Sequence, residues 1–193
     1  MPSRIFVVKV GGSLYDLPDL GSRLRAFLRD QCARASVILV PGGGPTVDAV
    51  RLLDRLHALG EETSHWLALR ALTLNAHFLA ALLPPTRIVG ALDEWNRSEV
   101  AILDVHAFAR ADELRPGRLP HIWAVTSDAF AARIAVVFNA DALILLKSTT
   151  IPQGMDWSEA GRRGWVDEWF AEVLREAPAE LQVRAVNLRT FFG

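Results

Sequence analysis

The sequence predicts an α/β fold, a three-layer αβα sandwich with a mainly parallel central sheet, in one domain of 193 residues. Short apolar runs alternate along the chain with longer segments of helical periodicity. Several of the runs, such as Val37–Val40 and Ala142–Leu146, are apolar without alternation, which is typical of strands that helices cover on both faces. The length is sufficient for a substantial core.

The predicted elements follow one another in βαβ order. The apolar, β-rich runs predict strands at 5–10, 36–40, 87–90, 100–105, 121–125, 142–147 and 183–188. Helical periodicity predicts helices at about 19–34, 45–60, 63–83, 128–138 and 165–177. Pro45 opens the second helix, where its fixed φ and missing N–H suit a first turn. Leucines of this helix fall on one side and its charged residues on the other, as in a helix packed on a core.

Composition and charge exclude several classes of protein. Hydrophobic residues make up 51% of the chain and the net charge is −1, so we expect neither nucleic-acid nor membrane-surface binding through bulk charge. The Ala/Leu-rich stretch 66–83 is interrupted by Arg70, Asn75 and His77 and is not expected to span a membrane. Cys32 is the only cysteine, and the N-terminus does not resemble a signal peptide. These features predict a cytoplasmic protein.

Two glycine clusters directly follow predicted strands, KVGGS at 9–13 and PGGG at 41–44. Ligands of open α/β sheets bind beyond the carboxyl ends of the strands. Glycine allows close approach of the backbone, and N–H groups at a helix N-terminus attract anions. Lys9 adds a point charge that can follow a phosphoryl group. The clusters therefore indicate two phosphate-bearing ligands, although each could also be only a tight strand-to-helix turn. Neither a P-loop nor a Rossmann fingerprint is present.

Two further charged residues occupy comparable positions. The segment TSDAFAARIA, 126–135, places Asp128 at the start of a helix, and LILLKSTT, 143–150, places Lys147 at the end of a strand. An acidic residue in a first helical turn also compensates the helix dipole, so the position of Asp128 alone does not require catalysis.

In this order the motifs resemble those of the amino acid kinase superfamily, which includes acetylglutamate, aspartate, carbamate and uridylate kinases. The segments GGGPTVDAVR, ETSHWLALRAL and LPHIWAVTSDAFAARIA are most similar to the small archaeal-type kinases of aminomethylfuranmethyl phosphate in methanofuran biosynthesis. The resemblance covers most of residues 4–150. It implies a phosphotransferase that uses ATP and Mg²⁺ on a small acceptor, which can itself be phosphorylated.

The resemblance also implies roles for individual residues. Lys9 would contact the transferred phosphoryl group and Asp128 would organise the lysines, as the catalytic pair. The nucleotide side would comprise Gly11, Gly12, Ser13 and Lys147. The acceptor side would comprise Gly42, Gly43, Gly44, Arg51, His65, His121 and Ser127. Mg²⁺ would be carried mainly by the phosphates, with no protein metal site. Arg51 could equally be a solvated residue of a helix face, and each histidine could be a packed, hydrogen-bonded residue without direct function.

The chain would form a single kinase domain, with an acceptor-binding part at about 1–120 and a shortened nucleotide-binding part at about 121–193. After Thr150 it is shorter than larger members, and KSTT replaces an expected aspartate. Gly154, Gly161 and Gly164 suggest either a mobile flap that offers Arg162 and Arg163 to phosphate or a disordered surface loop. Asp167 lies in a segment that resembles the subgroup, without a role that sequence reasoning provides.

Other functions stay open at this stage. The chain could phosphorylate another small carboxylate or phosphate, or it could bind a nucleotide or oxyanion without catalysis. The segment LALRALTLNAHFLAALL is apolar around much of its circumference, so it could serve a homo-oligomer as well as a core.

Overall fold

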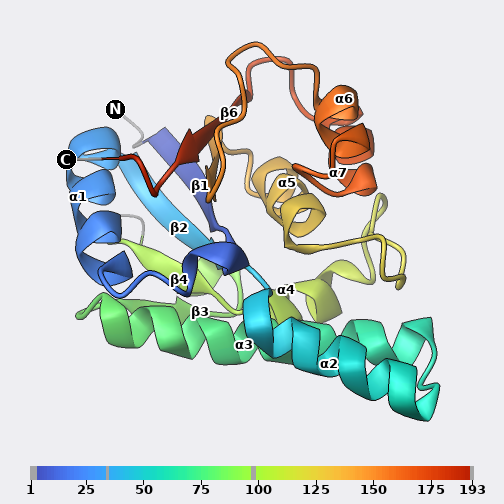
Figure 1. The fold of residues 1–193 in the computed structure, drawn as a ribbon. Coiled ribbons are helices and arrows are strands. Elements are labelled where there is room, and N and C mark those ends of the chain that lie inside the picture. The colour runs from blue at the N-terminus through green and yellow to red at the C-terminus, as the bar shows by residue number, and fades with distance from the viewer. Residues whose placement is uncertain (1–3, 34, 97–98, 192–193) are drawn as a thin grey trace.

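One parallel sheet forms the centre of the molecule, and helices cover both of its faces (Figure 1). The computed structural model describes residues 4–33, 35–96 and 99–191. Along the sheet the strands are β3 (Arg87–Val89), β4 (Ala101–Leu103), β2 (Ala35–Pro41), β1 (Arg4–Val10), β5 (Ala142–Lys147) and β6 (Gln182–Asn187). Every neighbouring pair is parallel, which confirms the predicted α/β class.

The helices lie in the intervals between the strands. They are α1 (Leu20–Cys32), α2 (Gly44–His57), α3 (Glu61–Leu82), α4 (Val105–Asp112), α5 (Ser127–Val137), α6 (Trp157–Arg162) and α7 (Glu168–Arg175), with 3₁₀ turns η1 (Gly12–Leu14) and η2 (Leu92–Glu94). No helix in the described part of the chain combines the length and apolar character needed to cross a bilayer.

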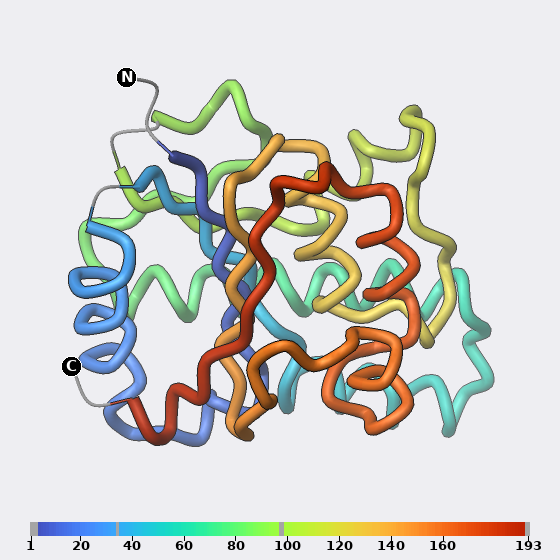
Figure 2. Tube along the Cα trace, turned by 90° about the horizontal axis from the view of Figure 1, so that it is seen from above, coloured from blue at the N-terminus to red at the C-terminus, as the bar shows by residue number. Residues whose placement is uncertain are grey.

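Alternate residues of each central strand face opposite layers. In β1, Val7 packs into a cluster with α5, whereas Val8 and Val10 pack with α1 on the other face. Figure 2 shows the strands between α1 on one side and the orange to red α6 and α7 on the other. The N-terminal half of α3 joins the first cluster, through Leu69 among others, and its C-terminal half joins the second, through Leu79.

The predicted strand at 121–125 is wrong. This segment forms turns, in which the N–H of Ile122 donates to Pro120 and that of Val125 donates to Ile122. Its apolar side chains line a cavity instead of joining the sheet. Only Val125 of this segment is buried, and Ala124 is exposed, so the apolar composition reflects the cavity lining and not a strand of the sheet.

Two helices were not expected from the sequence. The strand predicted at 100–105 ends at Leu103, because the carboxylate of Asp104 accepts hydrogen bonds from the N–H groups of His106 and Ala107 and starts α4. Asp156 starts α6 in the same way, through the N–H of Glu159. Helix α6 occupies much of the segment for which a flap or disordered loop was considered.

Candidate active site

A buried group of three charges lies at the carboxyl edge of the sheet. Nζ of Lys9 is 2.8 Å from Oδ1 of Asp128, and Nζ of Lys147 is 2.7 Å from Oδ2 of the same carboxylate. The three residues are between 4% and 9% exposed. One carboxylate therefore holds two ammonium groups in register.

The fold explains why these residues meet. Lys9 and Val7 are two residues apart in β1, and Lys147 and Leu145 are two apart in β5, so both lysines point to the face covered by α5. Asp128 lies in the first turn of α5, where the side-chain hydroxyl of Thr126 caps the helix. The strand period and the helix start together bring the three side chains into contact.

The charges influence one another strongly. Burial acts to raise the pKa of Asp128, but the two lysine ammonium groups reverse this effect and lower it. Burial and repulsion by Lys9 lower the pKa of Lys147 to about 8, although Asp128 opposes both effects. The site therefore keeps an ionised carboxylate between two cations, one of which loses its proton at mildly alkaline pH.

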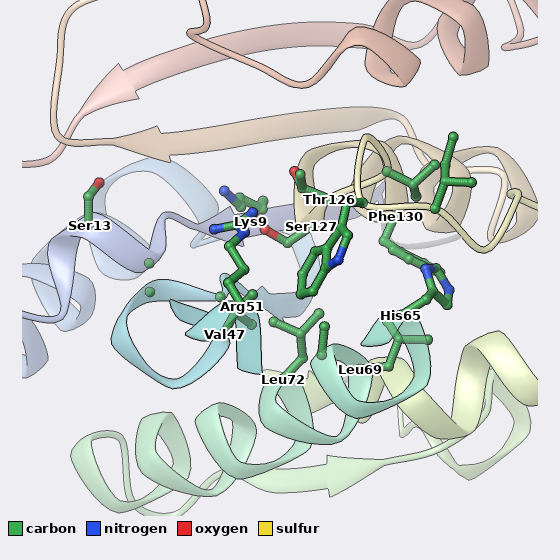
Figure 3. Close-up of a pocket in the computed structure, with 17 residues that line it drawn as sticks. Lys9, Ser13, Val47, Arg51, His65, Leu69, Leu72, Thr126, Ser127 and Phe130 are labelled. Atoms are coloured by element: carbon green, nitrogen blue, oxygen red, sulfur yellow. The ribbon is translucent and has the colours of Figure 1, made fainter. Parts of the chain in front are cut away.

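A cavity of about 220 Å³ opens beside Lys9. Its polar end is formed by the glycine loops with Ser13, Ser127 and Thr126, and Figure 3 shows Ser13 and His65 at opposite ends of the lining. We call its apolar lining the apolar wall, which consists of Val47, Ala68, Leu69, Leu72, Ile122, Val125 and Phe130. The cavity thus combines an anion-binding end with a surface suited to a small apolar group.

The two glycine loops touch each other. A Cβ at Gly12 would lie 2.1 Å from N of Gly44, and one at Gly42 would lie 2.4 Å from N of Gly12. Gly12, Gly43 and Gly44 line the cavity. The N–H of Gly11 instead donates to the carbonyl oxygen of Leu146 at 2.9 Å, so it is not available to an ATP phosphate, contrary to the expectation. Gly42 is buried and serves the contact between the loops.

Polar side chains that sequence reasoning missed hold the triglycine loop, residues 42–44. Asn75 of α3 and Tyr15, next to η1, donate to its carbonyl groups, and Thr46 closes the same turn. The signal that could have indicated Asn75 is a single amide in an otherwise apolar stretch of helix.

Arg51 lies on the cavity side of α2 and extends toward Lys9 (Figure 3). Its guanidinium group lies 5.2 Å from the ring centroid of Trp123 and pairs with Asp48 at 3.0 Å. The indole N–H of Trp123 donates to Asp54 at 2.7 Å. Arg51 therefore lines the cavity together with Trp123, which the sequence did not indicate, and Asp54 holds the indole from outside the lining.

The two predicted histidines form a stacked pair, with ring centroids 4.9 Å apart. Only His65 lines the cavity. His121 lies behind it, with Nδ1 2.7 Å from Glu62 and Nε2 2.8 Å from Glu113. Burial, then the charge of His121, lowers the pKa of His65 to about 4.

Burial alone would lower the pKa of His121, but the hydrogen bonds to Glu113 and Glu62 outweigh it and raise the pKa. The protonated ring of His121 thus favours a neutral ring of His65 at the cavity.

Asp167 has a position that the sequence did not reveal. Its Oδ2 accepts hydrogen bonds from the hydroxyl and N–H of Thr126 at 2.6 and 3.1 Å and from the N–H of Ala129 at 2.9 Å. Its Oδ1 caps α7 through the N–H of Phe170. Burial raises the pKa of Asp167. One side chain from the C-terminal part therefore supports the helix start that carries Asp128.

Arg162 and Arg163 make local contacts in and beside α6. Both guanidinium groups pair with Glu159 in α6, at 2.6 and 2.7 Å, and Arg163 also lies over Trp165. These side chains are 69% and 52% exposed, so their contact with phosphate stays a prediction.

A second cavity, of about 380 Å³, lies between the segment 151–157 and β6, and includes Trp157, Val183 and Arg184. Ser13 of the first cavity lies 2.9 Å from Ser148, hydroxyl to hydroxyl, and three residues later Ile151 lines the second. The loop that follows β5 therefore contacts a residue of the first cavity and lines the second.

Comparison with known proteins gives a family match and similar folds. The amino acid kinase family matches residues 4–150. The [5-(aminomethyl)furan-3-yl]methyl phosphate kinase of Methanocaldococcus jannaschii is 25% identical over 147 residues, which cover 72% of this chain and 63% of that protein. The chain thus matches less than two thirds of the length of this relative.

Solved structures share the fold at lower identity. Uridylate kinase from Archaeoglobus fulgidus has a TM-score of 0.61 and 17% identity, over 96% of this chain and 92% of that chain. UMP kinase from Ureaplasma parvum has a TM-score of 0.64 and 11% identity, over 97% and 91%. Aspartate kinase from Synechocystis has a TM-score of 0.61 and 14% identity, over 95% and 38%. By its sequence match over residues 4–150 and by its architecture, the chain belongs to the amino acid kinase family.

Proposed function

We propose that this protein is a small-molecule kinase that transfers the γ-phosphoryl group of ATP to [5-(aminomethyl)furan-3-yl]methyl phosphate, the substrate in the name of its curated relative. The observation that carries the proposal is the ion-paired group of Lys9, Asp128 and Lys147 beside a cavity with one anion-binding end and one apolar wall. Methanofuran-type cofactor biosynthesis in the cytoplasm is the corresponding biological role.

The acceptor matches the cavity in its order of chemical groups. Its phosphate would meet Lys9, Arg51 and the triglycine loop, where positive charge and N–H groups gather. Its furan ring would lie against the apolar wall. Its ammonium group would point toward neutral His65, with the carboxylates of Glu62 and Glu113 behind it. Positive charge gathers at the phosphate end. At the other end two carboxylates and the one protonated ring of His121 between them leave net negative charge, so the cavity favours an acceptor of this polarity.

The nucleotide has a separate place. We assign its base and ribose to the second cavity, and its phosphates to the path along Ser148 and Ser13 toward Lys9. Both oxygens of Asp128 already face lysines, so this carboxylate does not offer a free ligand to Mg²⁺. The donor set therefore fits a Mg²⁺ ion held by phosphate oxygens, where it would neutralise part of their charge.

The chemistry requires positioning more than proton transfer. An oxygen of the acceptor phosphate forms a bond to the γ-phosphorus of ATP while the bond from that phosphorus to the β,γ-bridging oxygen breaks. ADP leaves with the electron pair and the acceptor becomes a diphosphate. No general base is needed when the attacking oxygen is anionic. Lys9 and Lys147 would stabilise charge on the moving phosphoryl group, with Asp128 setting their positions.

The test is turnover of ATP with a panel of acceptors in the presence of Mg²⁺. We expect the furan phosphate to be converted to a diphosphate, which ³¹P NMR detects. Its kcat/KM should be on the order of 100-fold above that of UMP or aspartate. Lys9→Met serves as the inactive control. Turnover only with UMP, aspartate or another small carboxylate would reject this acceptor but keep a kinase. Nucleotide binding without turnover of any acceptor would favour a binding protein without catalytic activity.

Homo-oligomer formation stays a prediction. Light scattering coupled to size-exclusion chromatography determines the oligomeric state directly.

A further inference from the structure

Asn75 is a buried amide in a helix that is otherwise mainly apolar. It lies on α3, is 2% exposed, and reaches the triglycine loop. Burying an amide without hydrogen bonds is costly, so its partners indicate why the position is polar.

The amide bonds to the triglycine loop and lies next to Thr46. Nδ2 donates to the carbonyl oxygens of Gly42 and Gly43, each at 2.7 Å, and Oδ1 lies 3.0 Å from the hydroxyl of Thr46. The reverse orientation of the amide would place Oδ1 against two carbonyl oxygens, which are acceptors only. The contacts therefore define which side of the amide faces the loop.

Other hydroxyl groups lie close to the two carbonyl groups. The hydroxyl of Tyr15 donates to Gly42 at 3.0 Å, and the single proton of the Thr46 hydroxyl is shared between the oxygen of Gly43, at 2.7 Å, and Oδ1 of Asn75. Tyr15 is itself held by an edge-on contact with Phe78 of α3, with ring centroids 5.3 Å apart. The bracket formed by Asn75, Tyr15 and Thr46 thus holds both carbonyl groups.

This arrangement decides the polarity of the loop, by which we mean the side to which its carbonyl groups point and the side to which its N–H groups point. In a planar trans peptide, the C=O of one residue and the N–H of the next point in opposite directions. Because the carbonyl groups of Gly42 and Gly43 point to the bracket, the N–H groups of Gly43 and Gly44 point away from it. Both of these glycines line the cavity. N–H groups turned toward the cavity would bind an anion, whereas a rotated peptide would present repelling carbonyl oxygens.

We propose that Asn75 is a positioning residue that fixes the polarity of the triglycine loop, so that its N–H groups face the anionic group of the acceptor. The inference rests on the proposed function only in assigning this loop to the acceptor. Its consequence is selective: loss of the bracket weakens binding of the acceptor anion and leaves the affinity for ATP nearly unchanged.

The test compares Asn75→Leu, which keeps the approximate volume, with Tyr15→Phe, which keeps the ring and removes one donor. Thr73→Val is the matched control on the same helix, because Thr73 donates to Asp104 and not to the loop. Inorganic phosphate is titrated into ¹⁵N-labelled protein while the amide signals of Gly43 and Gly44 are followed. Steady-state KM values for the furan phosphate and for ATP are measured in parallel.

We expect Asn75→Leu to weaken phosphate binding and to raise the acceptor KM by on the order of tenfold, with the ATP KM within about twofold. Tyr15→Phe should raise the acceptor KM by about threefold. Thr73→Val should change only thermal stability. A folded Asn75→Leu protein with unchanged phosphate affinity would overturn the inference, as would equal losses for acceptor and ATP. If Asn75→Leu does not fold, unchanged phosphate binding by Tyr15→Phe overturns it.

The two proposals fail in different ways. If the wild type does not convert the furan phosphate, the proposed acceptor is rejected, but the phosphate titration still tests Asn75. If phosphate leaves the signals of Gly43 and Gly44 in the wild type unchanged, the loop is not an anion site and the inference about Asn75 is rejected.

Discussion

Lys9 and Asp128 belong to different layers of the fold, yet Nζ of Lys9 lies 2.8 Å from Oδ1 of Asp128 in a buried ion pair. Lys9 comes from the central strand β1 and Asp128 from the first turn of α5, so sheet and helix must pack correctly before the pair exists. The pair is coupled through the same carboxylate to Lys147.

This coupling makes the effects of substitution non-additive. We expect Lys9→Met to lower kcat by about 100- to 1000-fold with little change in nucleotide affinity, because a donor to the moving phosphoryl group is lost. Asp128→Asn should have a similar effect, and the double variant should be little worse than the poorer single one. Glu172→Gln, at an exposed acid of α7, is the control for loss of a carboxylate. An Asp128→Asn protein with normal kcat and only a lower Tm would assign Asp128 to dipole compensation alone.

The pH dependence should report Lys147, whose pKa is lowered to about 8 by burial and by Lys9. Since the ammonium form stabilises transferred charge, kcat should fall as the pH rises through about 8. Asp128→Asn removes an attraction that raises this pKa, so its descending limb should move to lower pH. Lys147→Gln should lack this limb. An unchanged limb in Lys147→Gln would assign it to another group.

The same shift has a defined sign for stability. The folded state releases the proton of Lys147 at a lower pH than the unfolded chain does, because its pKa falls from 10.5 to about 8. Between these values the unfolded state binds more protons, so this residue makes the free energy of unfolding increase with pH. Denaturant unfolding between about pH 8 and pH 10.5 measures this effect. The free energy of unfolding should increase less with pH in Lys147→Gln than in the wild type.

The histidine pair should titrate at two widely separated pH values. NMR should show His65 neutral down to about pH 4, and His121 protonated to a higher pH than an ordinary histidine. His121→Gln removes the neighbouring positive charge, so the pKa of His65 should rise, while burial still keeps it below 6.5. An unchanged pKa of His65 in this variant would show that burial alone accounts for the shift.

Asp167 should affect both stability and catalysis. Asp167→Ala removes the acceptor for Thr126, Ala129 and Phe170, and we expect a loss of at least about 1 kcal/mol in the free energy of unfolding. We also expect a lower kcat, because the start of α5 positions Asp128. Asp104→Ala is the matched control, since Asp104 caps α4 and lines neither cavity. Equal kcat in the two variants would confine Asp167 to a structural role.

Gly12 should not tolerate a side chain. A Cβ there would approach N of Gly44 to 2.1 Å, so Gly12→Ala must separate the two glycine loops. We expect a loss of activity on the order of 100-fold with a lowered Tm. Gly161→Ala is the control, because the nearest atom to its Cβ would be 3.7 Å away. Full activity of Gly12→Ala would show that contact between the loops is unnecessary for function.

The sequence by itself determined the class of the fold, and it indicated Lys9, Asp128 and Lys147 at strand ends and a helix start. Unbroken apolar runs indicate strands covered on both faces, and the period of two along β1 and β5 directs Lys9 and Lys147 to one layer. Glycines after strands and an acid at a helix start are local signals. They could therefore be read without knowledge of distant contacts.

Tertiary structure decided the features that depend on contacts far apart in the chain. Asn75 bonds to Gly42 across 33 positions, and Asp167 bonds to Thr126 across 41, so neither partner is visible in a local pattern. The segment 121–125 has the apolar composition of a strand, but packing placed it along the cavity. A local sequence pattern reports that a side chain is buried or that a helix begins, whereas the surface that receives it is defined only when the layers have packed together.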